Sequence, residues 1–352
     1  MVERVGDEVR RIARAVLYEG YLLWPYRQSA LKNQRRWLLG GVYPEPFARE
    51  HPGDLWQTQT QCLIEAGPDD TVDVGVRFLH VVQRDLARRL DGGGLEPVPE
   101  LIVDGQPHLP REEAIEREVT AAGLVLDELA RSPYRQDTTV PAGRETEWLT
   151  DAAGRRVGAA VATWEALGCR LDVSAERLAP RLYRLTAVVS NTTPWSGGTR
   201  AEVAKRTLVS AHVVLYSAGG RFVSLIDPPD ELREHAERCR NIGLWPVLAG
   251  AEGDRSTMLS APIILYDHPK VAPESPGDLF DATEIDKLLT LSILALSDEE
   301  HREIRAGDPR AREILDRCTS LTPEQLMRLH GVFRDVRVHG VFRDVRAAGP
   351  GR

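Results

Sequence analysis

The chain has 352 residues, of which 42% are hydrophobic, and its formal net charge is −8. That length allows one large domain or two ordinary ones, and the apolar fraction suffices for a substantial core. The acidic balance argues against a nucleic-acid-binding surface, which usually carries a basic excess.

The N-terminal segment and the cysteines predict a cytoplasmic protein. The first twenty residues contain acids from Glu3 onward and no uninterrupted apolar stretch, so they do not resemble a secretory signal. No stretch of apolar residues is long enough for a membrane span. The cysteines lie far apart and form no CxxC motif, which is typical of reduced, buried thiols rather than of a zinc ribbon or a redox pair.

Residues 2–17 carry apolar side chains at steps of three and four, which predicts one amphipathic helix. The following segment, 18–37, interleaves aromatic rings with cations. Such residues stack on one another, bind anions or acidic peptides, and are common anchors of protein interfaces. The alternative is an amphipathic segment that packs its rings inward. The residues expected to contact a partner are Tyr18, Tyr21, Trp24, Tyr26, Arg27, Lys32, Arg35, Arg36 and Trp37.

The centre of the chain predicts β structure. Alternating apolar and polar residues favour strands at 57–66 and 71–82. Residues 182–195 predict a further strand that ends in a Thr/Pro turn. Residues 207–226 predict a hairpin around the turn SAGG. Several short strands separated by turns are typical of an antiparallel sandwich or a curved sheet.

Other segments predict helices or loops. Pro110 followed by acids favours a helix over REEAIEREV, and Asp227 ahead of two prolines favours a capped helix at 227–241. Residues 131–156 are polar and rich in turn formers, so we expect an irregular segment. Ser or Thr followed three residues later by Glu or Gln, as at 297–300 and 322–325, predicts helix starts near the C-terminus.

These elements predict an α+β fold: an antiparallel β core, sandwich-like or a curved sheet, with an N-terminal helix and a helical C-terminal region. The expected division is an N-terminal α/β lobe at 1–130, a β-rich lobe with a helix at 157–296, and a helical region with a tail at 297–352. These boundaries are soft and also allow a single domain. The tail repeats HGVFRDVR after nine residues, an offset that turns the second copy to the opposite face of a helix or a strand.

The first candidate for a chemical site follows the apolar run Ile263–Tyr266, which predicts a buried strand that ends at Asp267. The acids between 267 and 286 are dense enough to hold a divalent cation, and a histidine there could act as a ligand or a general base. The candidate catalytic residues are Asp267, His268 and Glu274, and the candidate metal ligands are Asp267, His268, Asp278 and Asp281. The spacing does not match a calcium-binding loop. The alternative is structural, because acids also cap turns and favour helix N-termini.

A thiol–imidazole pair is the second candidate. Cys62 and His80 lie on strands that we expect to pair, and Cys239 lies on the helix predicted at 227–241. A thiolate beside an imidazole can be a nucleophile or a soft-metal site. The alternative is that these are ordinary buried side chains. The sequence contains no Gly-x-Ser-x-Gly, Walker or His-Glu-x-x-His motif.

The stretches LYEGYLLWPYRQSALKNQRRW, LWPVLAG and SAPIILYDHPKVAPESPGDLFDATEID resemble those of an uncharacterised bacterial family, mainly actinobacterial, found in gene clusters of high-affinity nickel–iron hydrogenases. The resemblance covers nearly the whole chain. It implies a cytoplasmic accessory protein for assembly, maturation or scaffolding, with hydrogenase subunits or maturation proteins as partners, and it assigns no catalytic residue and no cofactor. The alternative is an enzyme or metal-binding protein with a polar site around Asp267, His268 and Glu274.

Overall fold

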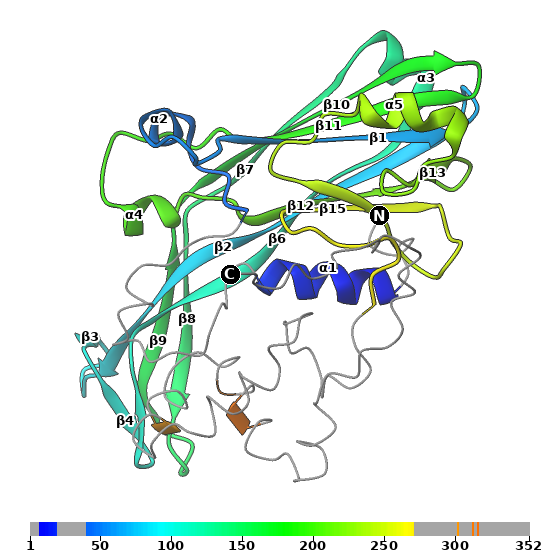
Figure 1. The fold of residues 1–352 in the computed structure, drawn as a ribbon. Helices are drawn as coiled ribbons and strands as arrows, with labels where there is room; N and C mark the ends of the chain where they lie inside the picture. The colour runs from blue at the N-terminus through cyan, green and yellow to red at the C-terminus, as the bar shows by residue number, and fades with distance from the viewer. Residues whose placement is uncertain (1–6, 20–39, 271–300, 303–311, 313–314, 317–352) are drawn as a thin grey trace, which may run out of the picture.

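The computed structural model describes residues 7–19, 40–270, 301–302, 312 and 315–316 (Figure 1). About half of the described residues lie in strands, every strand pair is antiparallel, and the helices are few and short. The predicted α+β class is therefore wrong, because antiparallel sheets supply most of the regular structure. Within the described residues no helix with assigned bounds follows the last strand, so the predicted helical C-terminal region is not supported; only residues 301–302, 312 and 315–316 are described there, as isolated helical positions. Most of 297–352 lies outside the described residues.

Five strands form the first sheet, which lies in the upper part of Figure 1. Their order is β13-β1-β11-β10-β7. The strands are β1 (Gln57–Glu65), β7 (Tyr134–Val140), β10 (Leu167–Ala179), β11 (Leu182–Asn191) and β13 (Arg221–Val223).

Eight strands form the second sheet, in the order β14-β15-β12-β2-β9-β8, with β3 and β6 also paired to β2. A small hairpin, β4 and β5, stands beside it. The bounds are β2 (Thr71–Arg89), β3 (Leu95–Val98), β4 (Leu101–Val103), β5 (Gln106–His108), β6 (Arg111–Val125), β8 (Gly143–Thr150), β9 (Arg156–Trp164), β12 (Val209–Tyr216), β14 (Trp245–Leu248) and β15 (Thr257–Ala261).

The main hydrophobic core lies between the two sheets. Val74, Val76 and Phe78 contribute to it from β2, and Leu171 and Leu185 contribute from the five-stranded sheet. All five side chains are buried. Two antiparallel sheets that bury their facing side chains form a β-sandwich.

Strand β2 organises the second sheet because it is 19 residues long and changes neighbours along its length. On one edge it pairs with β6 over residues 71–84 and then with β3 over 86–89; on the other edge it pairs with β12 over 73–79 and then with β9 over 83–88. The strand continues well beyond the predicted end at residue 82. Its second half, together with β3, β4, β5, β8 and β9, projects below the sandwich in Figure 1, and we call this projection the arm.

One long, bent hairpin joins the two sheets. Its two legs are β7 followed by β8, and β9 followed by β10; β7 pairs with β10 in the first sheet, and β8 pairs with β9 in the second. The legs cross between the sheets at 141–142 and 165–166. The irregular segment predicted at 131–156 is therefore wrong, since it supplies two strands. Its polar residues suit edge strands, which are largely exposed here.

Strands from the two expected lobes, 1–130 and 157–296, also pair with one another. The strand β1 pairs with β11, and β2 pairs with β9. The described residues from 57 to 261 therefore form one interleaved β unit.

The helix predicted over REEAIEREV is wrong, because that segment forms β6. Glu and Arg favour helices weakly, and tertiary pairing overrides such preferences. Here β6 pairs with β2 along most of its length, and charges meet across the strands in the ion pairs Arg77–Glu116 and Arg84–Glu113. Cross-strand pairs of opposite charge stabilise such a ladder.

The hairpin predicted at 207–226 is also wrong. Strand β12 belongs to the second sheet and β13 to the first, so the turn SAGG carries the chain from one sheet to the other. A Cβ atom on Gly219 would lie 2.0 Å from Asp70 Oδ1, which explains the glycine at this close approach.

Helix α1 (Asp7–Glu19) covers the outer face of the second sheet (Figure 1). Its buried residues, Val9, Ile12 and Ala13, pack on β12, β14 and β15 side chains, and Leu17 packs beside Leu79. The other helical elements are α2 (Glu45–Glu50), α3 (Leu126–Arg131), α4 (Arg200–Ala204), the 3₁₀ turn η1 (Asp230–Leu232) and α5 (Arg233–Glu237). Among the described residues, no helix has the length and apolar character required to cross a membrane.

Candidate functional site: an aromatic and arginine surface beside α2 and α4

Helices α2 and α4 bring two distant segments together at one end of the sandwich (Figure 1). Pro44 precedes α2 and Pro46 lies in its first turn, where a missing N–H costs no helical hydrogen bond. Thr199 caps α4: its hydroxyl accepts a hydrogen bond from the Glu202 N–H, and the Glu202 carboxylate accepts one from the Thr199 N–H at 2.6 Å. Local sequence thus fixes both helix starts.

Aromatic rings from both segments pack together. Tyr43 and Phe47 stack with ring centroids 5.4 Å apart, and Phe47 stacks on His51 at 4.0 Å. The Trp195 ring meets Phe47 edge-on at 6.0 Å. Phe47 is buried together with Val203 of α4, while Trp195 is only partly buried. Offset and edge-to-face pairs add to the stabilisation from burial, so this group holds its rings in fixed positions.

Arg200 lies over two of these rings. Its guanidinium carbon is 5.5 Å from the Tyr43 centroid and 5.8 Å from the Phe47 centroid. Two of its nitrogens donate to the two carboxylate oxygens of Asp54 at 3.0 and 2.9 Å. The hydrogen bond to Asp54 raises the pKa of Arg200. The pKa of Tyr43 is also raised, mainly by burial and to a smaller extent by the negative charge of Asp54. The Arg200 side chain is nevertheless 52% exposed, so one side of the guanidinium remains available to another molecule.

Arg206 repeats this arrangement nearby. Its guanidinium lies 5.6 Å from the Trp195 ring centroid and forms an ion pair of 3.0 Å with Glu165. The buried amide of Asn191 donates to the carbonyls of Val42 and Arg206, both at 2.8 Å, and thereby ties the two segments together. Buried, fully bonded polar groups of this kind make a local structure rigid.

We call this group the aromatic–arginine surface. It combines partly exposed rings with arginines that are already oriented by carboxylates. Its chemistry suits binding, because its rings pack on one another and its arginines are already paired with carboxylates. Its members are Tyr43, Phe47, His51, Asp54, Glu165, Trp195, Arg200 and Arg206.

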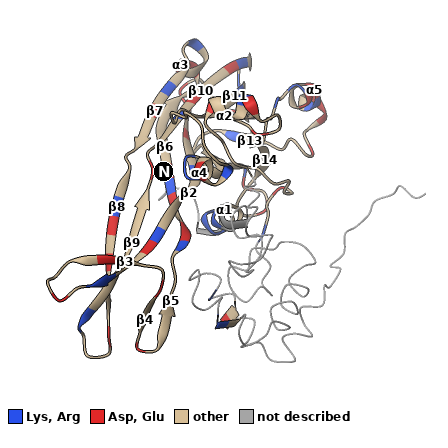
Figure 2. Ribbon diagram, turned by 90° about the vertical axis from the view of Figure 1, so that its left-hand side faces the viewer, with Lys and Arg blue, Asp and Glu red and all other residues tan. Residues whose placement is uncertain are grey.

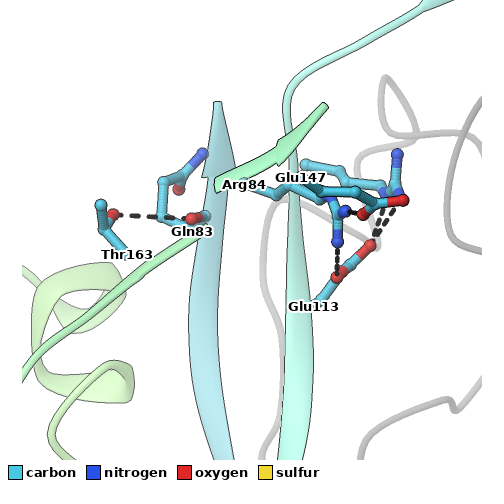
Figure 3. Close-up of polar contacts among 6 residues, drawn as sticks. Gln83, Arg84, Glu113, Glu147 and Thr163 are labelled. Atoms are coloured by element: carbon cyan, nitrogen blue, oxygen red, sulfur yellow. Dashed lines mark hydrogen bonds and ion pairs between the residues drawn. The ribbon is translucent and has the colours of Figure 1, made fainter. Parts of the chain in front are cut away.

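A second group of charges lies at the start of the arm, where Figure 2 shows bands of both signs along the strands. Arg84 of β2 bridges Glu113 of β6, at 3.1 Å, and Glu147 of β8 (Figure 3). Arg111 also binds Glu113, at 2.6 Å. The network links the three strands β2, β6 and β8. Each of its two arginines is paired with a carboxylate, so neither is left as an unpaired cation. We interpret it as structural.

Asp267 and His268, both candidate catalytic residues and metal ligands, close the free edge of β14. One Asp267 oxygen accepts from the Leu248 N–H at 2.7 Å, and the other accepts from the Ser224 hydroxyl. The His268 N–H donates to the Leu248 carbonyl at 2.7 Å. Pro246 has no N–H to present on the same edge. Unpaired edge strands invite association with other chains, and blocking these groups protects against it.

Replacing Asp267 with alanine should therefore reduce stability by about 1–3 kcal/mol, because it leaves the Leu248 N–H without an acceptor. Asp267→Asn, which keeps an acceptor oxygen, should lose less. Chemical denaturation measures both. If Asp267→Ala kept full stability and instead removed a stoichiometric metal found by elemental analysis, this structural role would be wrong.

The predicted strand end before Asp267 also differs. The run 263–266 was expected to be buried, but β15 ends at Ala261, and Ile264 and Tyr266 are 78% and 84% exposed. The remaining candidates of that region, Glu274, Asp278 and Asp281, lie outside the described residues.

The predicted partner-binding segment also lies almost entirely outside the described residues. Tyr18 belongs to α1, but the structure does not describe its side chain. The residues of that prediction outside the description are Tyr21, Trp24, Tyr26, Arg27, Lys32, Arg35, Arg36 and Trp37.

The strands that were predicted to carry the thiol–imidazole pair do not pair with each other. Cys62 is on β1 and His80 is on β2, and these strands belong to different sheets. Burial raises the pKa of Cys62 well above its ordinary value, and burial also raises that of Cys239. A thiol rather than a thiolate is a poor nucleophile and a poor metal ligand.

Among the described ranges, no three His, Cys, Asp or Glu side chains are grouped as a metal site would require. Sequence reasoning missed Tyr43, Phe47, Asp54, Trp195 and Arg200. The available signals were YPEPF and PWSGGTR, each with aromatics beside proline or glycine, but nothing in either string shows that the two meet.

A comparison with protein-family models finds no match for this chain, and a comparison with curated proteins finds none either. The relationship to hydrogenase gene clusters therefore stays a prediction based on sequence resemblance.

Proposed function

We propose that this chain is a non-catalytic accessory protein that binds another protein through the aromatic–arginine surface. The observation that supports this most is the fixed geometry of Arg200 and Trp195, which are partly exposed yet held by Asp54, Tyr43 and Phe47. Trp, Tyr and Arg are the residues that most often dominate binding energy in interfaces. Side chains already ordered before binding lose little conformational entropy on association.

The charges of this surface indicate the kind of partner. Arg200 is paired with Asp54, Arg206 with Glu165, and Arg49 of α2 with Glu45. Because these cations are neutralised locally, the surface does not offer a strong positive field. It fits a partner surface of mixed polar and apolar character better than an acidic tail or a nucleic acid.

The partner that we propose is a subunit or maturation protein of a nickel–iron hydrogenase. Support for this identity comes from the sequence resemblance alone, whereas support for protein binding comes from the surface. The two parts of the proposal can therefore fail separately.

Co-purification after co-expression with the hydrogenase subunits and maturation proteins tests both parts. The wild type should retain one of them, and the double variant Trp195→Ala, Arg200→Ala should bind it at least about 30-fold more weakly, since two hot-spot residues are worth about 2 kcal/mol or more. The matched control is Trp148→Ala, Arg156→Ala, which removes an exposed tryptophan and an arginine from the arm. There the guanidinium carbon of Arg156 lies 4.9 Å from the Trp148 ring centroid.

The control variant should bind as the wild type does, and both variants should keep their thermal transitions. Equal binding by the wild type and the Trp195, Arg200 variant would refute the proposal that this surface binds the partner. If no hydrogenase protein is retained, and hydrogenase assembly is unchanged after deletion of the gene, the proposed identity of the partner is refuted.

A further inference from the structure

The five-stranded sheet ends at one side in the edge strand β7 (Tyr134–Val140). Within the described part of the chain, β10 is the only strand that pairs with β7. Figure 2 shows β7 above β8 along one side of the molecule. The other sheet ends in β14, whose free edge is closed by Asp267 and His268, whereas β7 has no such closure among the described residues. An edge strand without closure offers main-chain N–H and C=O groups to a further strand.

The residues of β7 favour pairing and limit its extent. The strand contains a tyrosine, two threonines and a valine, all of which favour strands. Its half-buried side chains are uncharged: the Tyr134 hydroxyl donates to the Gln136 amide oxygen at 2.9 Å, and the Gln136 amide nitrogen donates to the Thr138 hydroxyl at 3.3 Å. Pro133 and Pro141 flank the strand and have no N–H to donate. An added strand can therefore pair with β7 but not far beyond its ends.

Two ion pairs of opposite direction join β7 to β10 on the outer face of the sheet. Arg135 lies opposite Asp172, with 2.5 Å between Nε and Oδ1. Asp137 lies opposite Arg170, with 2.8 Å between Oδ1 and Nε. The Arg135 and Asp137 side chains are nevertheless 64% and 57% exposed, so each remains open to a second partner of opposite charge.

We propose that β7 is the dimer interface of this protein: it pairs antiparallel with β7 of a second copy, about a two-fold axis at Gln136. In this register Arg135 of each copy lies opposite Asp137 of the other, and Tyr134 of each lies opposite Thr138 of the other. The two five-stranded sheets then form one continuous sheet. A two-fold contact of this kind uses the same surface on both copies, so it closes at a dimer.

The charges select this register over its neighbours. Across the four adjoining strands the signs alternate, because Arg170 and Asp137 of one copy continue into Arg135 and Asp172 of the other. A slip of two residues in one direction places Asp137 opposite itself, and a slip in the other direction places Arg135 opposite itself. Like charges directly opposite each other destabilise a strand pair, whereas opposite charges stabilise it. A slip of one residue turns the outer face of one strand toward the inner face of the sheet.

Sedimentation equilibrium of the full chain tests this proposal. A short strand pair buries little area, so the wild type should form a weak dimer with a dissociation constant of about 10 µM. Arg135→Glu and Asp137→Arg each place two like-charge pairs across the axis, and each should weaken the dimer at least about 10-fold. An equimolar mixture of the two variants should form a mixed dimer of near wild-type affinity, because both pairs across the axis then have opposite charges.

Arg88→Glu is the matched control for these variants. Arg88 forms an exposed ion pair of 2.6 Å with Glu96 across two strands of the arm, so its reversal breaks the same kind of contact away from β7. This variant should dimerise as the wild type does. A wild type that stays monomeric well above the expected dissociation constant would overturn the proposal, and this result does not depend on how the variants fold. A dimer that is unaffected by either β7 variant would overturn it as well.

A cysteine at position 136 tests the register without changing a charge. Position 136 faces its own copy across the axis, so Gln136→Cys should form a disulfide-linked dimer when it is oxidised with copper phenanthroline. Thr139→Cys should not, because the two copies of position 139 lie at opposite ends of the paired segment. The wild type, oxidised in the same way, controls for the native cysteines. Crosslinking at 139 but not at 136 would show that the strands do not pair about Gln136.

Discussion

Phe78→Ala should lower the free energy of unfolding by about 3–5 kcal/mol, which is the usual loss when a large aromatic side chain is removed from a packed core. Phe78 has no solvent exposure and lies in the main core, on a strand with neighbours on both sides. The surrounding strands cannot close the resulting cavity without breaking their pairing. Urea denaturation followed by far-ultraviolet circular dichroism measures the change.

Trp148→Ala is the matched control for this prediction. Trp148 is also an aromatic residue on a strand of the second sheet, but it lies on the edge strand β8 and is 37% exposed. Its loss should cost about 1 kcal/mol or less. Equal losses for the two variants would contradict the placement of the core between the sheets.

Acidification from pH 7 to pH 4 should destabilise the protein by about 3 kcal/mol for each of two buried histidines. His80 and His212 are fully buried, and both have pKa values lowered from 6.5 to about 4. Burial is the main cause for both; the charge of Arg117 adds to it at His80, and that of Arg77 at His212. Between pH 6.5 and 4 the unfolded chain binds protons that the folded chain does not, so stability falls as the pH falls through this window.

His212→Asn isolates one of these contributions. His212 Nδ1 lies 3.2 Å from the Ser210 carbonyl, and an asparagine amide can donate to the same oxygen without titrating. In chloride buffers, the loss of stability between pH 6.5 and 4 should therefore be about 3 kcal/mol smaller in the variant than in the wild type. Parallel stability curves for the two proteins would show that His212 does not titrate as its burial requires.

The parts of the fold that could be predicted are those with a local signal. The alternation of Val72, Val74, Val76 and Phe78 identifies the start of β2, and the apolar spacing of α1 identifies a helix. The sequence of β6 misleads because its Glu and Arg residues favour a helix locally, whereas its ion pairs to β2 exist only after distant segments meet. The sheet change after β12 leaves no local signal either, since a turn of small residues suits a hairpin equally well.

The candidate site could not be predicted for a similar reason. Phe47 and Arg200 lie more than 150 residues apart, and their contact depends on how α2 and α4 dock on the sandwich. Asp267 shows the converse. Its chemistry suggested catalysis, but the structure uses both of its oxygens to hold neighbouring segments in place. A polar residue type indicates a function only when its partners are known.

Site-specific photo-crosslinking in cells that express the hydrogenase tests the central claim most directly. A benzoylphenylalanine placed at position 195 should crosslink to a hydrogenase subunit or maturation protein, and the same group at position 148 on the arm should not. Such a result would place the partner on the aromatic–arginine surface. Crosslinks from position 148 alone, or none from position 195 in cells where the proteins co-purify, would contradict the account.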